Sequence, residues 1–483
     1  MSVHRAWMAG LALLAIGCTP SWVYVAEAPE QADTSSFAQS VALEGELALI
    51  GNSQSADLYE RPPDGSSLPP HLWVHIQRFT PAQGAPPGLF GKAVALSGDR
   101  LFIGAPWGEP QVIDNGYVDV YDRVGGTWTF TQRVTPESFD PPPGFGPEIL
   151  FGNALAVQGD ELFVGAHHYG DTAGRVFVFE RVGGLYQQTH ELKPPSDVQE
   201  TAFGETIRVS GDTLAISRRG PGGAGTGGGT PIVPGEVHVF IKSDGEWVPQ
   251  QVLFSPTSAP DDLFGSGIDL HGDRLVVLEE TAVHLFERSG GVWSAIWQRP
   301  VTDGGRKPVA FRPSTGTVPG YLFVSNEDTV QVLIEATDGS GYTPQGVLTD
   351  PDAQPGFGSA LSLSGDRLLV AATGGGTARA RIFERDTGGT RLQIIAIDDE
   401  ILRRTTAAMA EEIAASPELQ RQLDAALEGS REATQALATV AERHGLTVHH
   451  RSATLLLVDT EGNKAQLGRS KDGNTIIVQG FER

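Results

Sequence analysis

The chain has 483 residues, 40% of them hydrophobic, and a formal net charge of −24. This length suits two or three ordinary domains, or one large repeat domain with an appendage. A nucleic-acid binder needs a basic stripe that neutralises phosphates, so the acidic sequence excludes that class and suits a soluble protein outside the cytoplasm. The single cysteine, Cys18, excludes a disulfide framework and a cysteine zinc site.

The first residues predict an export signal. His4 and Arg5 precede an apolar run from Ala6 to Ile16 that is too short to span a bilayer. Residues 15–18 resemble the lipobox of bacterial lipoproteins, in which the cysteine is acylated and becomes the new N-terminus. The resemblance implies lipidation of Cys18, and Thr19 after it implies an outer-membrane lipoprotein of a bacterial envelope. The alternative is an ordinary signal peptide followed by an incidental cysteine.

One segment then recurs at a spacing of roughly 45–60 residues. Its clearest copy runs from Leu89 to Pro106 and contains Phe-Gly, then Gly-Asp, then Gly-Ala-Pro. Four further copies begin at Phe151, Phe203, Phe264 and Phe357. Two degenerate copies, Phe37 to Ile50 and Val309 to Val324, bring the number to seven.

Each copy has the pattern of four short strands. Gly-Asp makes a tight turn between the first two, because glycine supplies the positive φ, and a variable loop leads to the third. The fourth begins with an aromatic residue, which we expect to pack in the core rather than to stack on a sugar. These aromatic residues are Trp128, Tyr186, Trp247, Trp293 and Tyr342. Seven such units predict an all-β chain with a seven-bladed β-propeller of four-stranded antiparallel blades.

Residues 89–106 resemble the FG-GAP repeat, which is known from integrin α-chain propellers and from many bacterial surface proteins. The resemblance covers about residues 22–397 and implies a propeller, but it names no ligand, because propellers serve many functions. Integrin repeats often carry a calcium loop between the first two strands. Here Gly-Asp joins those strands directly, so we expect turn-forming aspartates and no metal. These are Asp99, Asp160, Asp212, Asp273 and Asp366.

Two segments compete to complete the last blade, whose first three strands run from Phe357 to Arg385. The segment from Trp22 to Pro29 has the aromatic start and proline end of a fourth strand. The segment from Arg391 to Ile397 follows a Gly-Gly turn but lacks the aromatic residue. We favour the N-terminal strand, because a ring closed by both chain ends leaves no open edge. The propeller domain is then expected over residues 19–397.

Residues 398–483 predict a small α+β domain, a helical hairpin followed by short strands. Glycine and proline become rare, and Ser416-Pro417 reads as a helix cap with proline at the first helical position. The second helix stops at Gly445. Residues 416–448 also resemble the Nif11-type leader of ribosomal peptide precursors, but no cysteine-bearing core follows. We interpret the unit as a packing or partner-binding module.

No catalytic or cofactor motif is apparent. The pairs His167-His168 and His449-His450 are poor metal sites, because adjacent strand residues point to opposite faces. The Gly-rich run 222–229 lacks the Lys-Ser/Thr of a phosphate loop and is interpreted as a flexible insertion. We therefore expect no catalytic residue, no cofactor and no bound metal.

The sequence favours a non-enzymatic, monomeric binding module of the cell envelope. Its recognition face for a protein or glycan is expected on the variable loops, from Trp107 to Gly116, from His167 to Gly174 and from Arg218 to Gly235. One alternative is an extracytoplasmic glycan hydrolase or lyase with two carboxylates at the propeller channel. Another is a scaffold in an envelope assembly that docks through the C-terminal unit.

Overall fold

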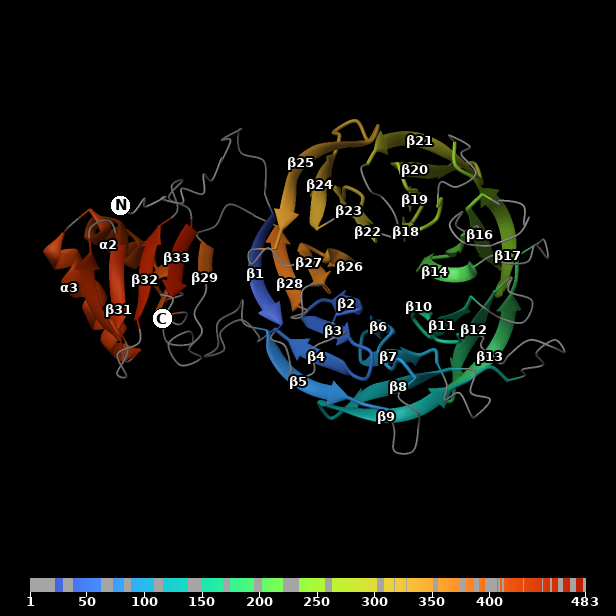
Figure 1. Cartoon of the computed structure of the whole chain (residues 1–483), viewed down its shortest axis with the longest axis horizontal. Coiled ribbons are helices and arrows are strands. Elements are labelled where there is room, and N and C mark those ends of the chain that lie inside the picture. The colour runs from blue at the N-terminus through green and yellow to red at the C-terminus, as the bar shows by residue number, and fades with distance from the viewer. Residues whose placement is uncertain are drawn as a thin grey trace, which may run out of the picture.

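Seven four-stranded antiparallel sheets form a ring in the computed structural model of the chain, with a separate sheet at the C-terminus (Figure 1). The structure describes residues 22–28, 38–61, 73–81, 88–107, 116–137, 150–167, 174–194, 202–219, 234–256, 263–301, 308–316, 318–326, 328–350, 355–373, 379–385 and 391–395 of the first part of the chain. In the C-terminal part it describes 406, 409–410, 412–428, 430–444, 446–451, 454–458, 464–469 and 475–480. The predicted seven-bladed propeller is confirmed.

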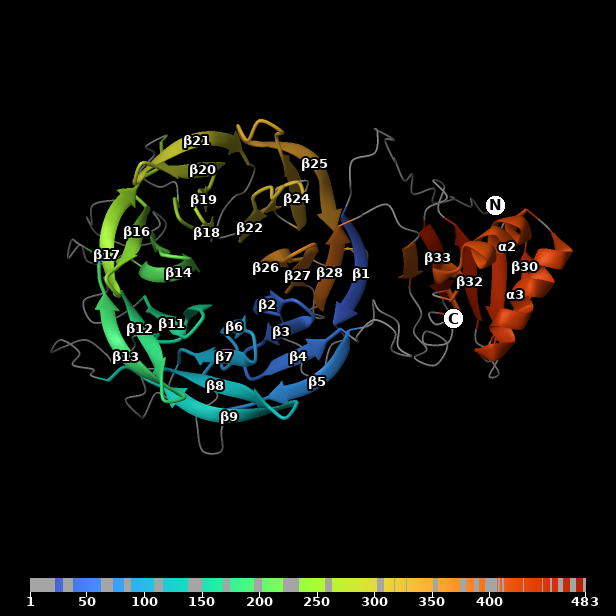
Figure 2. The same cartoon turned by 180° about the vertical axis from the view of Figure 1, so that it is seen from behind.

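Each blade runs from an inner strand at the channel to an outer strand at the rim (Figures 1 and 2). The first six blades are β2 (Ser40–Glu44) to β5 (Val74–Phe79), β6 (Ala93–Ser97) to β9 (Thr127–Val134), β10 (Ala154–Gln158) to β13 (Leu185–Leu192), β14 (Ala202–Ser210) to β17 (Glu246–Leu253), β18 (Gly267–His271) to β21 (Val292–Pro300), and β22 (Val309–Arg312) to β25 (Tyr342–Thr349). Their middle strands are β3 (Leu47–Gly51), β4 (Ala56–Glu60), β7 (Arg100–Ala105), β8 (Tyr117–Val124), β11 (Glu161–Ala166), β12 (Arg175–Val182), β15 (Thr213–Arg219), β16 (Glu236–Ser243), β19 (Arg274–Leu278), β20 (Ala282–Ser289), β23 (Tyr321–Asn326) and β24 (Thr329–Glu335).

The N-terminal strand closes the ring. Blade 7 consists of β26 (Phe357–Ser364), β27 (Arg367–Ala372), β28 (Arg379–Arg385) and β1 (Trp22–Ala28). Strand β1 pairs antiparallel with β28, from Trp22 opposite Arg385 to Ala28 opposite Ala380. The rival segment forms β29 (Arg391–Ile395), which pairs in parallel with β33 (Thr475–Gly480) of the C-terminal sheet. The C-terminal unit thus includes a strand that lies before residue 398.

The Gly-Asp turns have the predicted form. Ser97 pairs with Arg100, so that Gly98 and Asp99 alone join β6 to β7. Gly98 has a φ of 56°, which glycine adopts without steric cost. We call the end of the ring that carries these hairpins the turn face, and the end that carries the Phe-Gly segments the motif face.

The hydrophobic core lies between the blades. The described residues form seven clusters in the propeller, one at each junction of neighbouring blades, including that of blade 7 with blade 1. The once-per-blade aromatic residues belong to these clusters and are at most 4% exposed, so their predicted role in the core is confirmed; they are Trp128, Tyr186, Trp247, Trp293 and Tyr342.

The Phe-Gly and Gly-Ala-Pro ends of the repeat form a joint between blades. Phe90 of blade 2 is fully buried against blade 1 and bridges Gln54 there. A Cβ on Gly104 of blade 2 would lie 2.1 Å from the carbonyl oxygen of Gly152 of blade 3. Glycine at this position lets two backbones approach more closely than any side chain permits. Phe37 of blade 1 lies outside the described residues.

The C-terminal unit packs helices on a sheet, and residues 412–415, which precede α2, are also helical. Its strand order is β29-β33-β32-β31-β30, with β30 (Thr447–Arg451), β31 (Thr454–Val458) and β32 (Lys464–Arg469). Helix α2 (Pro417–Leu427) has Ser416 as its cap and proline in its first turn, as predicted. Helix α3 (Arg431–Arg443) follows, and both contribute to one hydrophobic cluster with the sheet. No helix among the described residues has the length and apolar character that a membrane crossing requires.

We predict that Gly104→Ala destabilises the protein by about 1–3 kcal/mol, because the added methyl group must force two blades apart. Gly346→Ala is the matched control. Gly346 also lies in a strand, but no atom lies within 4 Å of a Cβ built there. The control is expected to be neutral or to gain up to about 1 kcal/mol. Urea unfolding monitored by far-UV circular dichroism compares the two variants, and equal midpoints would contradict the assignment of the joint.

Candidate functional site

The central channel is lined by residues from the inner strands of all seven blades and holds a cavity of about 300 Å³. When the repeats are aligned on Phe-Gly, or on the inner strand where blades 1 and 6 lack that motif, the lining residues fall into three successive positions. The first and third positions carry branched aliphatic side chains, such as Val94 and Leu96 in β6. Along the strands, these first-position and third-position residues form two aliphatic rings on either side of a middle ring; blade 5 contributes to neither ring and blade 6 contributes only Val309.

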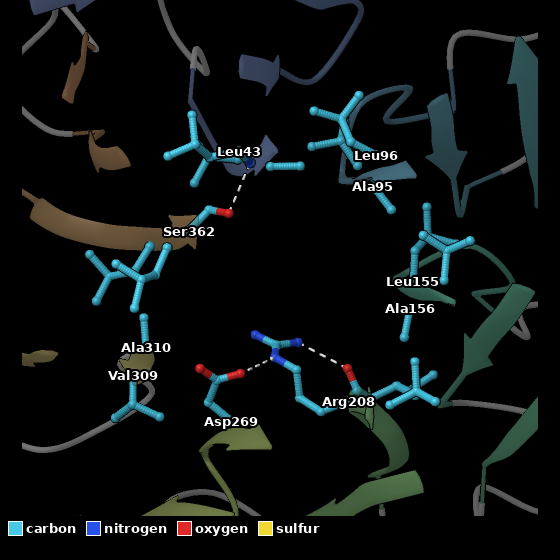
Figure 3. A pocket seen from close by; sticks show the side chains of 18 residues that line it. Leu43, Ala95, Leu96, Leu155, Ala156, Arg208, Asp269, Val309, Ala310 and Ser362 are labelled. Carbon is cyan, nitrogen blue, oxygen red and sulfur yellow. Dashed lines mark hydrogen bonds and ion pairs between the residues drawn. The ribbon is translucent and has the colours of Figure 1, made fainter. Parts of the chain in front are cut away.

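The middle ring is built from small residues with two exceptions. Five blades place alanine or serine there; these are Ala42, Ala95, Ala156, Ala310 and Ser362. Blades 4 and 5 instead place Arg208 and Asp269, which form an ion pair across the junction between these neighbouring blades. The long side chain of Arg208 projects into the space that the small residues leave open (Figure 3).

The ion pair is held from both sides. Arg208 Nε donates to Asp269 Oδ1 at 3.2 Å, and Arg208 Nη1 donates to the carbonyl oxygen of Ile207 at 2.9 Å. Asp269 also accepts backbone N–H groups, from Leu270 at 3.2 Å and from Phe311 of blade 6 at 2.8 Å. Both side chains are partly open to the channel, with exposed fractions of 36% for Arg208 and 21% for Asp269.

Burial raises the pKa of Asp269 above the ordinary value of an aspartate. The positive charge of Arg208 and the two backbone N–H groups act in the opposite direction, because they favour the ionised carboxylate. The net direction shows that removing this carboxylate from water outweighs the partners that the channel supplies.

Ser362 makes the same type of contact as Asp269 without a charge. Its Oγ accepts the backbone N–H of Leu43 in the next blade at 2.9 Å. The inner edge of each blade faces the channel and has unpaired backbone groups, so one side chain of the preceding blade satisfies one such group. Nearer the turn face, four further side chains accept the N–H of the Gly-Asp or Gly-Glu glycine of the next blade; they are Glu44, Gln158, Ser210 and Ser364.

The turn face is tied together by ion pairs. Arg100 directly follows one Gly-Asp turn and reaches Asp160 of the next at 2.6 Å. Arg312 reaches Asp366 at 3.1 Å, and Arg385 and Arg312 hold the pKa of Asp366 below its usual value. The turn aspartates thus also anchor neighbouring blades. Among the residues that the structure describes, no group of three His, Cys, Asp or Glu side chains is arranged to hold a metal ion.

The chemistry available in the channel is limited. Glycoside hydrolysis uses a pair of carboxylates, one as acid and one as base or nucleophile. Asp269 is the one carboxylate among the described residues that line the cavity, and it is already paired with Arg208. The described lining residues thus supply one of the two carboxylates that such a reaction uses.

The other sites expected from the sequence fall largely outside the described residues. Cys18 lies outside them, as do residues 108–115, 168–173 and 220–233, which make up most of the three expected recognition loops and include His168 and the Gly-rich run. His167 lies at the end of β11, and His449 is exposed on β30. Of the two described residues, neither His167 nor His449 lines the channel cavity.

Sequence reasoning missed Arg208 and Asp269. Both stand in inner strands that we interpreted only as part of the fold. The available signal was a break in the aligned repeats, because two neighbouring copies replace a small residue with opposite charges. That signal identifies an ion pair, but its position in the channel depends on the ring geometry.

Comparison with known proteins supports the FG-GAP resemblance for one segment. Residues 73–121 match the family model of the FG-GAP repeat, which confirms that expectation over β5 and most of blade 2. No curated protein matched the chain.

Solved propellers are similar at low identity. A structure named as a candidate 6-phosphogluconolactonase from Bacteroides uniformis is 12% identical with a TM-score of 0.46, over 65% of this chain and 85% of that chain. A periplasmic gluconolactonase from Pseudomonas aeruginosa is 16% identical with a TM-score of 0.45, over 65% of this chain and 87% of that chain.

Asp269→Asn is expected to change how stability depends on pH. A carboxyl group with a raised pKa in the folded state binds more protons folded than unfolded, so wild-type stability falls as pH rises through the ordinary aspartate pKa towards the raised value. Asparagine keeps an acceptor for the N–H of Phe311 but does not titrate. The variant should therefore gain stability relative to wild type as pH rises above the ordinary aspartate pKa, as measured by urea unfolding at a series of pH values. A variant that loses relative stability as pH rises would show that Arg208 overcompensates the burial of this carboxylate.

Proposed function

We propose that the protein is a monomeric envelope lipoprotein whose propeller binds a protein or glycan and catalyses no reaction. The observation that carries the proposal is that the Asp269 carboxylate in the channel is already occupied by hydrogen-bond donors. Asp269 is the one carboxylate among the described cavity-lining residues, and it is bound by Arg208 and two backbone N–H groups. A general acid or base needs a free proton-transfer position and, for glycan cleavage, a second carboxylate.

The residues of the repeat motif pack between neighbouring blades, so binding must involve other residues. Phe90 is buried and Gly104 lies against the next blade, so neither is accessible to a partner. The inter-strand connections at the motif face differ in length from blade to blade, as is typical of a recognition surface on a rigid frame.

Among the described residues, two exposed aromatic side chains lie at the motif face. Trp107 follows β7 and is 50% exposed, and Phe254 follows β17 and is 51% exposed. The backbone N–H of Trp107 donates to the carbonyl oxygen of Gly88 at 2.8 Å, which fixes the main chain there. An exposed tryptophan on a fixed backbone is a typical anchor for a protein or a sugar.

The proposed lipid would direct the motif face away from the membrane. Trp22 pairs with Arg385, whose N–H donates to the carbonyl oxygen of Asp366 at the turn face. Cys18 precedes Trp22 by four residues, which span at most about 14 Å when extended. An acyl chain on Cys18 therefore holds the turn face towards the bilayer.

We predict that Trp107→Ala weakens binding to the envelope partner at least tenfold. The test captures protein and glycan ligands from envelope fractions on the immobilised full chain, then measures the affinity of the isolated ligand for each variant. Phe130→Ala is the matched control, because Phe130 is 47% exposed but lies on the outer strand β9. Its affinity should equal that of wild type. Equal losses in both variants, or turnover of the captured glycan by the wild-type protein, would refute the proposal.

The orientation is tested with the acylated protein in vesicles that carry a quencher on the lipid headgroups. A fluorophore is attached to Asp99→Cys at the turn face or to Trp107→Cys at the motif face, while acylation blocks Cys18. We expect stronger quenching at position 99, because that end lies nearer the lipid. Stronger quenching at position 107 would place the recognition face against the membrane and contradict this orientation. If mass spectrometry finds no acyl chain on the N-terminal peptide, the proposed lipid anchor is wrong.

A further inference from the structure

The channel contains a guanidinium whose hydrogen bonds are only partly used. Arginine has five N–H donors, and Arg208 uses one on Nε for Asp269 and one on Nη1 for the carbonyl oxygen of Ile207. The described residues provide no further partner for its remaining donors. The exposed part of the guanidinium projects into the cavity between the two aliphatic rings (Figure 3).

The seven repeats serve as an internal comparison for this ion pair. Four blades have alanine at the same middle position of the inner strand. Blade 7 uses Ser362, which satisfies the backbone N–H of the next blade without a charge. The ring therefore does not need an arginine and an aspartate there, and placing charges inside a protein costs free energy. Residues that break a local rule in this way commonly mark a functional site.

The pair is also arranged asymmetrically towards the cavity. Three donors already converge on Asp269, namely Arg208 Nε and the N–H groups of Leu270 and Phe311. Asp269 thus holds the guanidinium through its Nε side, and the Nη hydrogens that are not donated to Ile207 remain available. A planar fork of N–H donors held in this way matches the two oxygens of a carboxylate.

The walls determine what else the ligand contains. The cavity of about 300 Å³ is at the lower limit of small-molecule sites, and its lining side chains other than Arg208, Asp269 and Ser362 are aliphatic. We propose that the channel binds a small organic carboxylate with an aliphatic chain, whose carboxylate pairs with Arg208 and whose chain packs against the valine and leucine rings. This site is separate from the proposed recognition face.

Octanoate is the probe, and isothermal titration calorimetry on the full chain is the measurement. Octanol and octylamine test the head group, and butyrate tests the chain. We expect octanoate to bind at least tenfold more tightly than any of the three. Arg208→Gln should weaken octanoate at least tenfold, and Asp269→Asn should tighten it several-fold, because the guanidinium then has no competing anion.

Arg100→Gln is the matched control, since Arg100 is also paired with an aspartate but lies on the turn face. It should bind octanoate as wild type does, and so should Trp107→Ala. Thermal melts verify that each variant is folded. If Arg208→Gln fails to fold, the head-group series and the tightening by Asp269→Asn decide the question. No octanoate binding, equal binding of octanol, or an undiminished affinity in folded Arg208→Gln would overturn the proposal.

Discussion

Contact between the backbones of neighbouring blades is the constraint on which this propeller depends. At the joint of blades 2 and 3, the position of a Cβ on Gly104 is 2.1 Å from the carbonyl oxygen of Gly152, and Gly165 meets Gly204 of blade 4 in the same way at 2.2 Å. Such spacing brings the faces of adjacent sheets together tightly enough to bury phenylalanine and the outer aromatic residues in one cluster per junction. The repeat motif therefore encodes how one blade joins the next.

This role explains why the fold was largely predictable from the sequence. Phe-Gly, Gly-Asp and the outer aromatic residue are local signals, and each recurs in register because every junction imposes the same geometry. Closure by Trp22 and its neighbours was predictable for a related reason, since this segment has the pattern of a missing fourth strand. The parallel pairing of Arg391–Ile395 with β33 was not, because a short apolar strand does not specify a partner sheet.

The site was less predictable. Arg208 and Asp269 lie 61 residues apart and are neighbours only because consecutive blades lie side by side. Their residue types are ordinary on the surface of an acidic protein, and only alignment of the repeats identifies the positions as exceptional. Ser210 and Gln158 gave no signal for the same reason, since the backbone N–H groups that they satisfy are unpaired only at the inner edge of a closed ring.

Closure by the first strand also has a consequence for the time course of folding. Trp22 finds its partner only at Arg385, so β1, which precedes the other propeller strands in the chain, remains without a sheet until the last blade has been synthesised. The six intervening blades contain only strands that are near in sequence and can assemble earlier. The ring thus closes through its most distant contact, which is the slow, late class of folding event. A chain of this design depends on keeping one short segment soluble and unpaired until the other blades have formed.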